Sequence, residues 1–123
     1  MKLVVQVLVV DDDAPIRDFV RATLEGEGYE VVTAENGLVA LQLLSGETPY
    51  QPNVILLDMR MPIVDGWQFA KIYQELPGKK VPIIVLTAAT DPAKFAAQIN
   101  ADNFLPKPFD LTDLLDMVEQ ITQ

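Results

Sequence analysis

The sequence contains 123 residues, and none of them is a cysteine or a histidine. Without cysteine the chain cannot form a disulfide bond, a thiolate metal site or a cysteine nucleophile. Without histidine it cannot build a Ser-His-Asp triad or the usual zinc sites, and it cannot carry a phosphohistidine of its own. Any chemistry must therefore depend on carboxylates, hydroxyls, amides and the few basic groups.

Basic residues are scarce. The chain has 9 Lys and Arg against 18 Asp and Glu, which gives a formal net charge of −9. This balance argues against non-specific binding to nucleic acid or to an anionic membrane, because such binding depends on Lys and Arg. The length and the 50% hydrophobic content fit a globular chain, and we expect one domain over residues 1–123.

Long hydrophobic runs are also missing. The longest apolar stretch, Leu3–Val10, is interrupted by Gln6 and ends at three aspartates. It is far shorter than the roughly 20 residues that a membrane helix needs. Lys2 before an apolar stretch resembles the start of a signal peptide, but no small-residue cleavage site follows. We therefore expect a cytoplasmic location.

Five short apolar runs predict five β-strands. Three of them are nearly continuous in Val, Ile and Leu, which is typical of strands buried on both faces. The second and fifth runs are weaker, so we expect them near the edges of the sheet. In chain order the runs are Val4–Val10, Tyr29–Thr33, Val54–Leu57, Ile83–Leu86 and Asn103–Leu105.

The intervals between these runs carry helical patterns, with apolar residues at helical spacing and with capping residues or Gly and Pro at the ends. The expected helices run from Pro15 to before Gly28, around Leu38 to Ser45, from Asp65 to before Pro77, from Asp91 to Ile99, and from Asp110 through Val118. Strict alternation of strands and helices predicts a (βα)₅ parallel sheet with right-handed crossovers and helices on both faces.

Polar residues directly follow four of the five expected strands. In an open α/β sheet, ligands bind beyond the carboxyl ends of the strands, so these side chains should meet at one end of the sheet. In chain order they are Asp11, Asp12, Asp13, Asp58, Thr87 (followed by Ala88 and Ala89) and Lys107.

This set of groups suits a phosphoryl group. Carboxylates that crowd together repel each other, and Lys107 supplies only one compensating charge. Mg²⁺ could supply the remaining positive charge, because it binds through one or two carboxylates and keeps water and phosphate oxygens as further ligands. The metal and the lysine would neutralise phosphoryl oxygens, Thr87 would donate a hydrogen bond to one of them, and a carboxylate could attack phosphorus.

Four motifs occur in order at the expected strand ends. They are Val9-Val10-Asp11-Asp12, Leu57 to Pro62 followed by Asp65-Gly66, Leu86-Thr87-Ala88, and Lys107-Pro108-Phe109. In this order they resemble the response-regulator receiver domain of two-component signalling, over essentially the whole chain. The resemblance implies a flavodoxin-like sheet with strand order 2-1-3-4-5, a Mg²⁺ cofactor, and a phosphoryl donor on a histidine kinase or a histidine phosphotransfer protein.

The resemblance also implies roles for the acidic residues. Asp58 resembles the phosphoacceptor, which takes a phosphoryl group from a partner's phosphohistidine. Asp12 resembles a direct magnesium ligand, together with Asp58 and the backbone carbonyl of Arg60. Asp11 resembles the acid that holds a water bound to the metal. A receiver of this kind catalyses only its own phosphorylation and dephosphorylation, so we do not expect a separate enzyme activity.

Further roles follow from the same resemblance. Lys107 resembles the lysine that pairs with phosphoryl oxygens, and Thr87 with the Ala88 amide resembles the donor pair that closes on them. Phe104 resembles the switch aromatic, although a plain core role has equal weight. In the family these movements change the face formed by the fourth helix, fifth strand and fifth helix. The family's lysine–proline bond is typically cis, which makes Lys107–Pro108 a candidate.

Some residues have simpler or additional interpretations. Asp13 precedes Ala14-Pro15 and is better explained as a helix cap than as a metal ligand. Trp67 should be partly exposed near the site. Arg60 lies two residues after Asp58, where its side chain can reach over a phosphoryl group, and we hypothesise that it alters the rate of hydrolysis.

Two other functions remain open, as does the oligomeric state. Asp11 to Asp13 contain the Asp-x-Asp pattern of haloacid-dehalogenase-like phosphatases, with Asp11 as nucleophile, although Asp58 would then have no role. A degenerate receiver that acts only as an adaptor is the other alternative. The face of the fourth helix, fifth strand and fifth helix could also support a weak homodimer, which one sequence does not establish.

Overall fold

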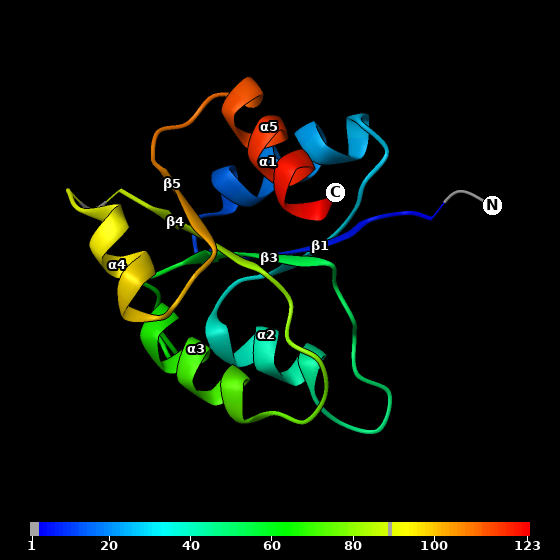
Figure 1. Ribbon diagram of the computed structural model, residues 1–123, viewed down its shortest axis with the longest axis vertical. Coiled ribbons are helices and arrows are strands. Elements are labelled where there is room, and N and C mark those ends of the chain that lie inside the picture. The colour runs from blue at the N-terminus through cyan, green and yellow to red at the C-terminus, as the bar shows by residue number, and fades with distance from the viewer. Residues whose placement is uncertain (1–2, 89) are drawn as a thin grey trace.

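The structure is a computed structural model that describes residues 3–88 and 90–123, so Ala89 and Lys2 lie outside the described residues. Strands and helices alternate along the described chain (Figure 1). The strands are β1 (Gln6–Val10), β2 (Glu30–Ala34), β3 (Val54–Asp58), β4 (Ile83–Thr87) and β5 (Asn103–Pro106). The helices are α1 (Ala14–Gly26), α2 (Gly37–Leu44), α3 (Gly66–Glu75), α4 (Pro92–Gln98) and α5 (Leu111–Thr122).

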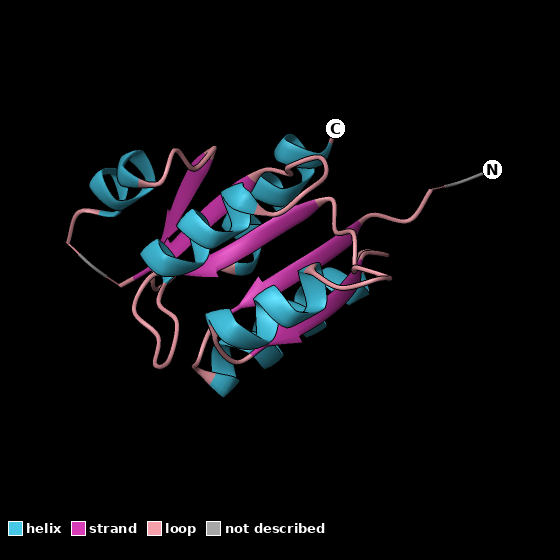
Figure 2. Cartoon of the chain, turned by 90° about the horizontal axis from the view of Figure 1, so that it is seen from below, coloured by secondary structure: helices cyan, strands magenta, loops and turns pink. Residues whose placement is uncertain are grey.

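The strands form one parallel sheet in the order β2-β1-β3-β4-β5, which confirms the predicted flavodoxin-like topology (Figure 2). The two weaker apolar runs, β2 and β5, are the edge strands, as expected. β1, β3 and β4 are central and nearly fully buried, because helices cover both of their faces.

The two faces of the sheet carry separate parts of the core. Alternate residues of a strand point to opposite faces, so Val7 and Val9 of β1 pack towards α1 and α5. Leu8 and Val10 pack on the other side, towards α2, α3 and α4. Figure 1 shows this layering, with α1 and α5 on one side of the sheet and α2 and α3 on the other.

An Asp or Asn precedes each helix and caps it. Each side chain accepts a hydrogen bond from the backbone N–H three residues later, which satisfies a donor that the helix leaves free. The five caps are Asp13, Asn36, Asp65, Asp91 and Asp110. Asp13 therefore caps α1, as predicted, by accepting from the Ile16 amide.

Strand boundaries differ from the predicted ones at both ends. β1 begins at Gln6 rather than Val4, because its partners begin at Glu30 and Val54 and the earlier residues have no strand to pair with. β3 and β4 each extend one residue further, to Asp58 and Thr87, so the sheet itself holds both residues.

We also find that no helix in the described parts of the chain is long and apolar enough to cross a membrane.

Candidate functional site

The predicted acidic residues meet at the carboxyl end of the sheet. Asp11 and Asp12 directly follow β1, and Asp58 is the last residue of the neighbouring strand β3. One carboxylate oxygen from each residue lies within 4.8 Å of the others. The Asp11 side chain is fully buried and Asp58 is 6% exposed, whereas Asp12 is exposed. The cluster is thus buried on one side and open to water on the other.

Lys107 is held against this cluster. Its Nζ lies 2.7 Å from Asp11 Oδ2 and 3.8 Å from Asp58 Oδ1. Its backbone N–H donates to the Thr87 carbonyl at 2.9 Å, and the Lys107–Pro108 bond is cis, as the resemblance implied. The ammonium is therefore fixed next to two carboxylates rather than being free in solvent.

The environment disfavours ionisation of Asp58. The pKa of its carboxyl is raised from 3.8 to about 7, mainly by burial and next by repulsion from Asp11. Lys107 and the Met59 N–H act in the opposite direction, and Asp12 raises the pKa further. One ammonium therefore does not compensate three neighbouring carboxylates.

The residues present fit a divalent cation. Apart from the Lys107 ammonium, the buried Asp11 Oδ2 accepts no hydrogen bond from the described residues. With Asp12 and Asp58 it belongs to a group of three oxygen donors, of which only Asp11 and Asp58 pair with the Lys107 ammonium. Mg²⁺ prefers oxygen ligands and keeps several waters, which the exposed side at Asp12 admits.

The loop after β3 is shaped by close contacts. The Gly66 N–H donates to the Met59 carbonyl at 2.8 Å, and a Cβ on Gly66 would lie 2.7 Å from Met59 Cα. Ile63 has φ 71°, which a β-branched residue rarely adopts. Asp65 and Gln68 form a capping box at the start of α3. This loop therefore fixes the backbone that directly follows Asp58.

The remaining predicted residues lie on β4 and β5. Thr87 is 2% exposed at the end of β4, and the exposed Ala88 follows it. Phe104 on β5 is half-buried and packs against the core under α2, α3 and α4. This position fits its core role, while its switch role stays a prediction.

Arg60 follows the acceptor, but its side chain points to two rings. Its guanidinium carbon lies 5.6 Å from the centroid of Trp67 and 5.5 Å from that of Phe95. In the described chain, no carboxylate oxygen lies within 4.0 Å of its nitrogens. Trp67 is partly exposed, as expected.

Sequence reasoning missed one supporting residue. Arg17 of α1 donates from Nη1 to the backbone carbonyl of Asp11 at 2.7 Å, and the Asp13 N–H donates to Asp11 Oδ1. These bonds orient Asp11 from its own backbone and from the first turns of α1. The only available signal was a basic residue in the helix that directly follows the acidic motif.

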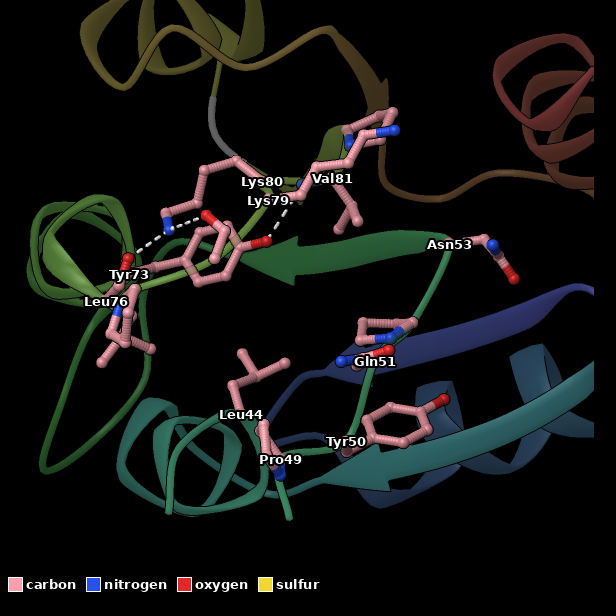
Figure 3. Close-up of a pocket in the computed structure, with 14 residues that line it drawn as sticks. Leu44, Pro49, Tyr50, Gln51, Asn53, Tyr73, Leu76, Lys79, Lys80 and Val81 are labelled. Atoms are coloured by element: carbon pink, nitrogen blue, oxygen red, sulfur yellow. Dashed lines mark hydrogen bonds between the residues drawn. The ribbon is translucent and has the colours of Figure 1, made fainter. Parts of the chain in front are cut away.

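A cavity of about 420 Å³ lies at the opposite, amino end of the sheet, between the loops before β3 and β4 (Figure 3). The buried Tyr50 hydroxyl has no hydrogen-bond partner among the described residues, whereas Lys80 and Tyr73 are bonded to nearby main chain. The Lys80 ammonium donates to the carbonyls of Leu76 and Gly78, and the Tyr73 hydroxyl accepts from the Val81 N–H. These contacts close the end of α3, so the charged cluster, rather than this cavity, marks the candidate site.

Comparison with known proteins gives a consistent result. The family model of the response regulator receiver domain matches residues 7–119. The chain is 38% identical over 113 residues to the response regulator MprA of Mycobacterium sp. (strain KMS), a match that covers 90% of this chain and 47% of that protein. The chain thus spans about half the length of the curated relatives it matches.

Solved structures agree. The chemotaxis protein CheY4 of Vibrio cholerae is 34% identical, with a TM-score of 0.83, over 97% of this chain and 99% of that chain. TrrA of Thermotoga maritima, solved in complex with Mg²⁺-BeF, is 34% identical, with a TM-score of 0.79, over 95% and 98%.

These matches bear on the phosphatase alternative and on the class of protein. None of them supports the phosphatase alternative built on Asp11. Receiver domains are signalling modules rather than classical enzymes; they bind Mg²⁺ at their aspartate cluster and depend on a phosphodonor kinase. The chain belongs to the response-regulator receiver family and is a phosphorylation-dependent signalling receiver.

Proposed function

We propose that Asp58 accepts a phosphoryl group from a phosphohistidine on a histidine kinase or histidine phosphotransfer protein, in a Mg²⁺-dependent reaction. One observation carries this proposal: Asp58 lies with Asp11 and Asp12 in a cluster of oxygens within 4.8 Å, and of these three residues the Lys107 ammonium contacts only Asp11 and Asp58. Such a site has oxygen ligands for a dication and a carboxylate that can act as a nucleophile.

The transfer itself needs Asp58 as a carboxylate. One of its oxygens attacks phosphorus and forms a P–O bond, while the P–N bond to the donor imidazole breaks. The electron pair of that bond returns to the imidazole nitrogen, which takes a proton from solvent. Mg²⁺, when bound, supplies positive charge that neutralises phosphoryl oxygens and keeps Asp58 ionised.

Three groups of this chain would hold the metal: the carboxylates of Asp12 and Asp58 and the backbone carbonyl of Arg60. Asp11 would hold a water of the hydration shell, since its carboxylate is already oriented by Lys107 and by the Asp13 amide. The exposed position of Asp12 supports this assignment, because the metal must enter from solvent.

Two further groups would bind the phosphoryl oxygens. Lys107 lies 3.8 Å from Asp58 and would pair with an oxygen of the group attached there. Thr87, at the end of the strand next to β3, would donate its hydroxyl together with the Ala88 amide. Movement of Thr87 would then let Phe104 follow and change the face formed by α4, β5 and α5.

The wider setting forms part of the same proposal. Residues 1–123 form a single receiver domain in the cytoplasm, which binds neither nucleic acid nor membrane through its own surface. The net charge of −9 supports the last point. In this proposal the α4-β5-α5 face also forms a weak homodimer, which sedimentation of the phosphorylated and unmodified forms would test.

The decisive experiment measures where the phosphoryl group goes. The protein is incubated with Mg²⁺ and acetyl phosphate, its intact mass is recorded, and the modified residue is mapped, with Asp58→Asn as the matched control. We expect one adduct on Asp58 that chelation of Mg²⁺ prevents. Turnover through Asp11 would instead support the phosphatase, and no adduct with any donor would support the adaptor.

A further inference from the structure

Four side chains form a cluster that begins two residues after Asp58. We call this cluster the Arg60 clamp, and its members are Arg60, Trp67, Phe95 and Gln98. The Arg60 guanidinium lies over the Trp67 and Phe95 rings, at 5.6 and 5.5 Å. The two rings meet edge to face with centroids 4.8 Å apart. The Trp67 indole N–H donates to Gln98 Oε1 at 2.8 Å.

The Arg60 clamp joins two consecutive segments to α4, which lies about 30 residues further along the chain. Arg60 belongs to the loop after β3, Trp67 to the first turn of α3, and Phe95 with Gln98 to α4. α4 is only seven residues long and otherwise packs on β4 and β5. The clamp therefore ties this short helix to the loop that contains the backbone carbonyl next to the acceptor.

The contacts of the guanidinium are weak ones. The Arg60 side chain is exposed, and cation–π contacts at exposed sites are worth little compared with hydrogen bonds between two charged groups. No carboxylate of the described residues pairs with it. A phosphoryl group on Asp58, two residues away, would bring two negative charges and three acceptor oxygens within reach of this side chain.

We propose that Arg60 is a positioning residue that couples phosphorylation to α4, an inference that rests on the proposed function. In the unmodified protein the guanidinium stays between Trp67 and Phe95 and holds α4. When Asp58 is phosphorylated, the guanidinium turns to the phosphoryl oxygens, the ring pair loses its cation, and α4 is released. This route is separate from any movement of Thr87 and Phe104.

The test uses the intrinsic fluorescence of Trp67, the only tryptophan in the chain. Emission is recorded in the metal-free protein, with Mg²⁺, and with Mg²⁺ and acetyl phosphate, while the intact mass of the same sample gives the phosphorylated fraction. Arg60→Met keeps the length of the side chain and removes its charge. Arg21→Met, which alters an exposed arginine of α1, is the matched control.

We expect phosphorylation to shift Trp67 emission in the wild-type protein and in Arg21→Met. Per phosphorylated molecule, Arg60→Met should lose this shift. Hydrogen exchange gives a second measurement: amides of residues 92–98 should exchange faster after phosphorylation of the wild-type protein, whereas in Arg60→Met they should exchange fast in both states.

Two results would overturn the coupling while leaving the proposed function intact: an adduct on Asp58 without any shift in Trp67 emission, or equal shifts in the wild-type protein and Arg60→Met. Absence of any adduct in the wild-type protein, seen directly in the mass spectrum, would overturn the proposed function and this inference with it.

Discussion

The loops at the amino end and at the carboxyl end of the sheet differ in backbone conformation and in charge. At the amino end, four described turns adopt positive φ: three of them use glycine (Gly28, Gly46 and Gly78), and the turn into β5 uses Asn100, a residue type that tolerates the left-handed conformation. At the carboxyl end, the loop after β3 adopts positive φ at Ile63, a β-branched residue that is 69% exposed. Residue types at the amino end therefore tolerate positive φ, whereas Ile63 at the carboxyl end holds a strained backbone conformation.

The same contrast holds for charge. Lys80 at the amino end donates to the carbonyls that finish α3, so the adjacent cavity has its ammonium already engaged. At the carboxyl end, Lys107 contacts Asp11 and Asp58, and Asp12 adds a third carboxylate to the same cluster. Cavity size therefore does not identify the functional end of this fold, whereas uncompensated buried charge does. The five predictions below test that contrast, from the largest expected effect to the smallest.

The first prediction concerns phosphorylation itself. Asp58→Asn should abolish the adduct with acetyl phosphate and Mg²⁺, because an amide oxygen is a poor nucleophile and a weaker metal ligand. Lys79→Ala, a change at the cavity of the amino end, should leave the adduct unaffected. Intact mass measures both. An equal loss of the adduct in the two variants would contradict the assignment of function to the carboxyl end alone.

The second prediction concerns packing behind the site. Gly66→Ala should lower the free energy of unfolding by about 3 kcal/mol, because the added Cβ would overlap Met59 and the Asp58 backbone. Gly26→Ala, at the end of α1 where a Cβ would meet no atom within 4 Å, should change it by less than about 1 kcal/mol. Urea denaturation compares the two, and equal effects would show that the loop after β3 can relax.

The third prediction concerns pH in the absence of metal. Folding raises the pKa of Asp58 to about 7, so the folded state binds more protons than the unfolded state between about pH 4 and 7. The contribution of Asp58 to stability is therefore most favourable below pH 4 and is lost as the pH rises through 7. Relative to Asp58→Asn, the wild-type protein should lose about 2 kcal/mol over this range, a figure discounted for the water that reaches the cluster.

Denaturation of both proteins in EDTA from pH 4.5 to 8 measures this difference. At pH 8, added Mg²⁺ should remove this difference in the free energy of unfolding between the wild-type protein and Asp58→Asn, because the cation stabilises the ionised cluster. If the difference in the free energy of unfolding between the two proteins did not depend on pH, the repulsion between Asp11 and Asp58 would have to be compensated in another way.

The fourth prediction concerns the lifetime of the adduct. Arg60→Ala should change the rate of hydrolysis by about fivefold, equivalent to about 1 kcal/mol, because the guanidinium shapes the access of water to the phosphoryl group. The decay of purified phosphoprotein gives the rate, with Arg21→Ala as control. An unchanged hydrolysis rate would contradict the hypothesis that the Arg60 side chain reaches the phosphoryl group.

The fifth prediction concerns the strain at Ile63. Ile63→Gly should raise the free energy of unfolding by about 0.5 kcal/mol, because relief of the left-handed conformation outweighs the extra chain entropy of glycine. Ile72→Gly, in the helical conformation of α3, should lower it by about 1 kcal/mol. A lower free energy of unfolding in Ile63→Gly would show that the positive φ at Ile63 is not a source of strain.

Much of the fold follows from local patterns. Runs of Val, Ile and Leu predicted the strands, and Asp13, Asp65 and Asp110 were correctly placed at helix starts, because burial and capping depend on residues near in sequence. The meeting of Asp11 and Asp58 was also predictable, since parallel strands end on the same side of a sheet.

Other features depend on neighbours in space. β1 begins at Gln6 because its partner β2 begins opposite that residue, and the Arg60 side chain lies between rings from α3 and α4. No pattern along the chain indicates which aromatic residue an arginine will contact, because that depends on how two helices pack. For the same reason, the bond from Arg17 to the Asp11 carbonyl was not predicted.

The sequence by itself determined the chemical inventory of the site, because a residue's type and its position after an apolar run are properties of the chain. It also determined that these 123 residues contain no histidine that could carry the phosphoryl group to be transferred. Only the tertiary structure decided the electrostatic state of Asp58 and the contacts of Arg60. A pKa and a cation–π contact depend on burial and on distances between segments, and folding alone sets both.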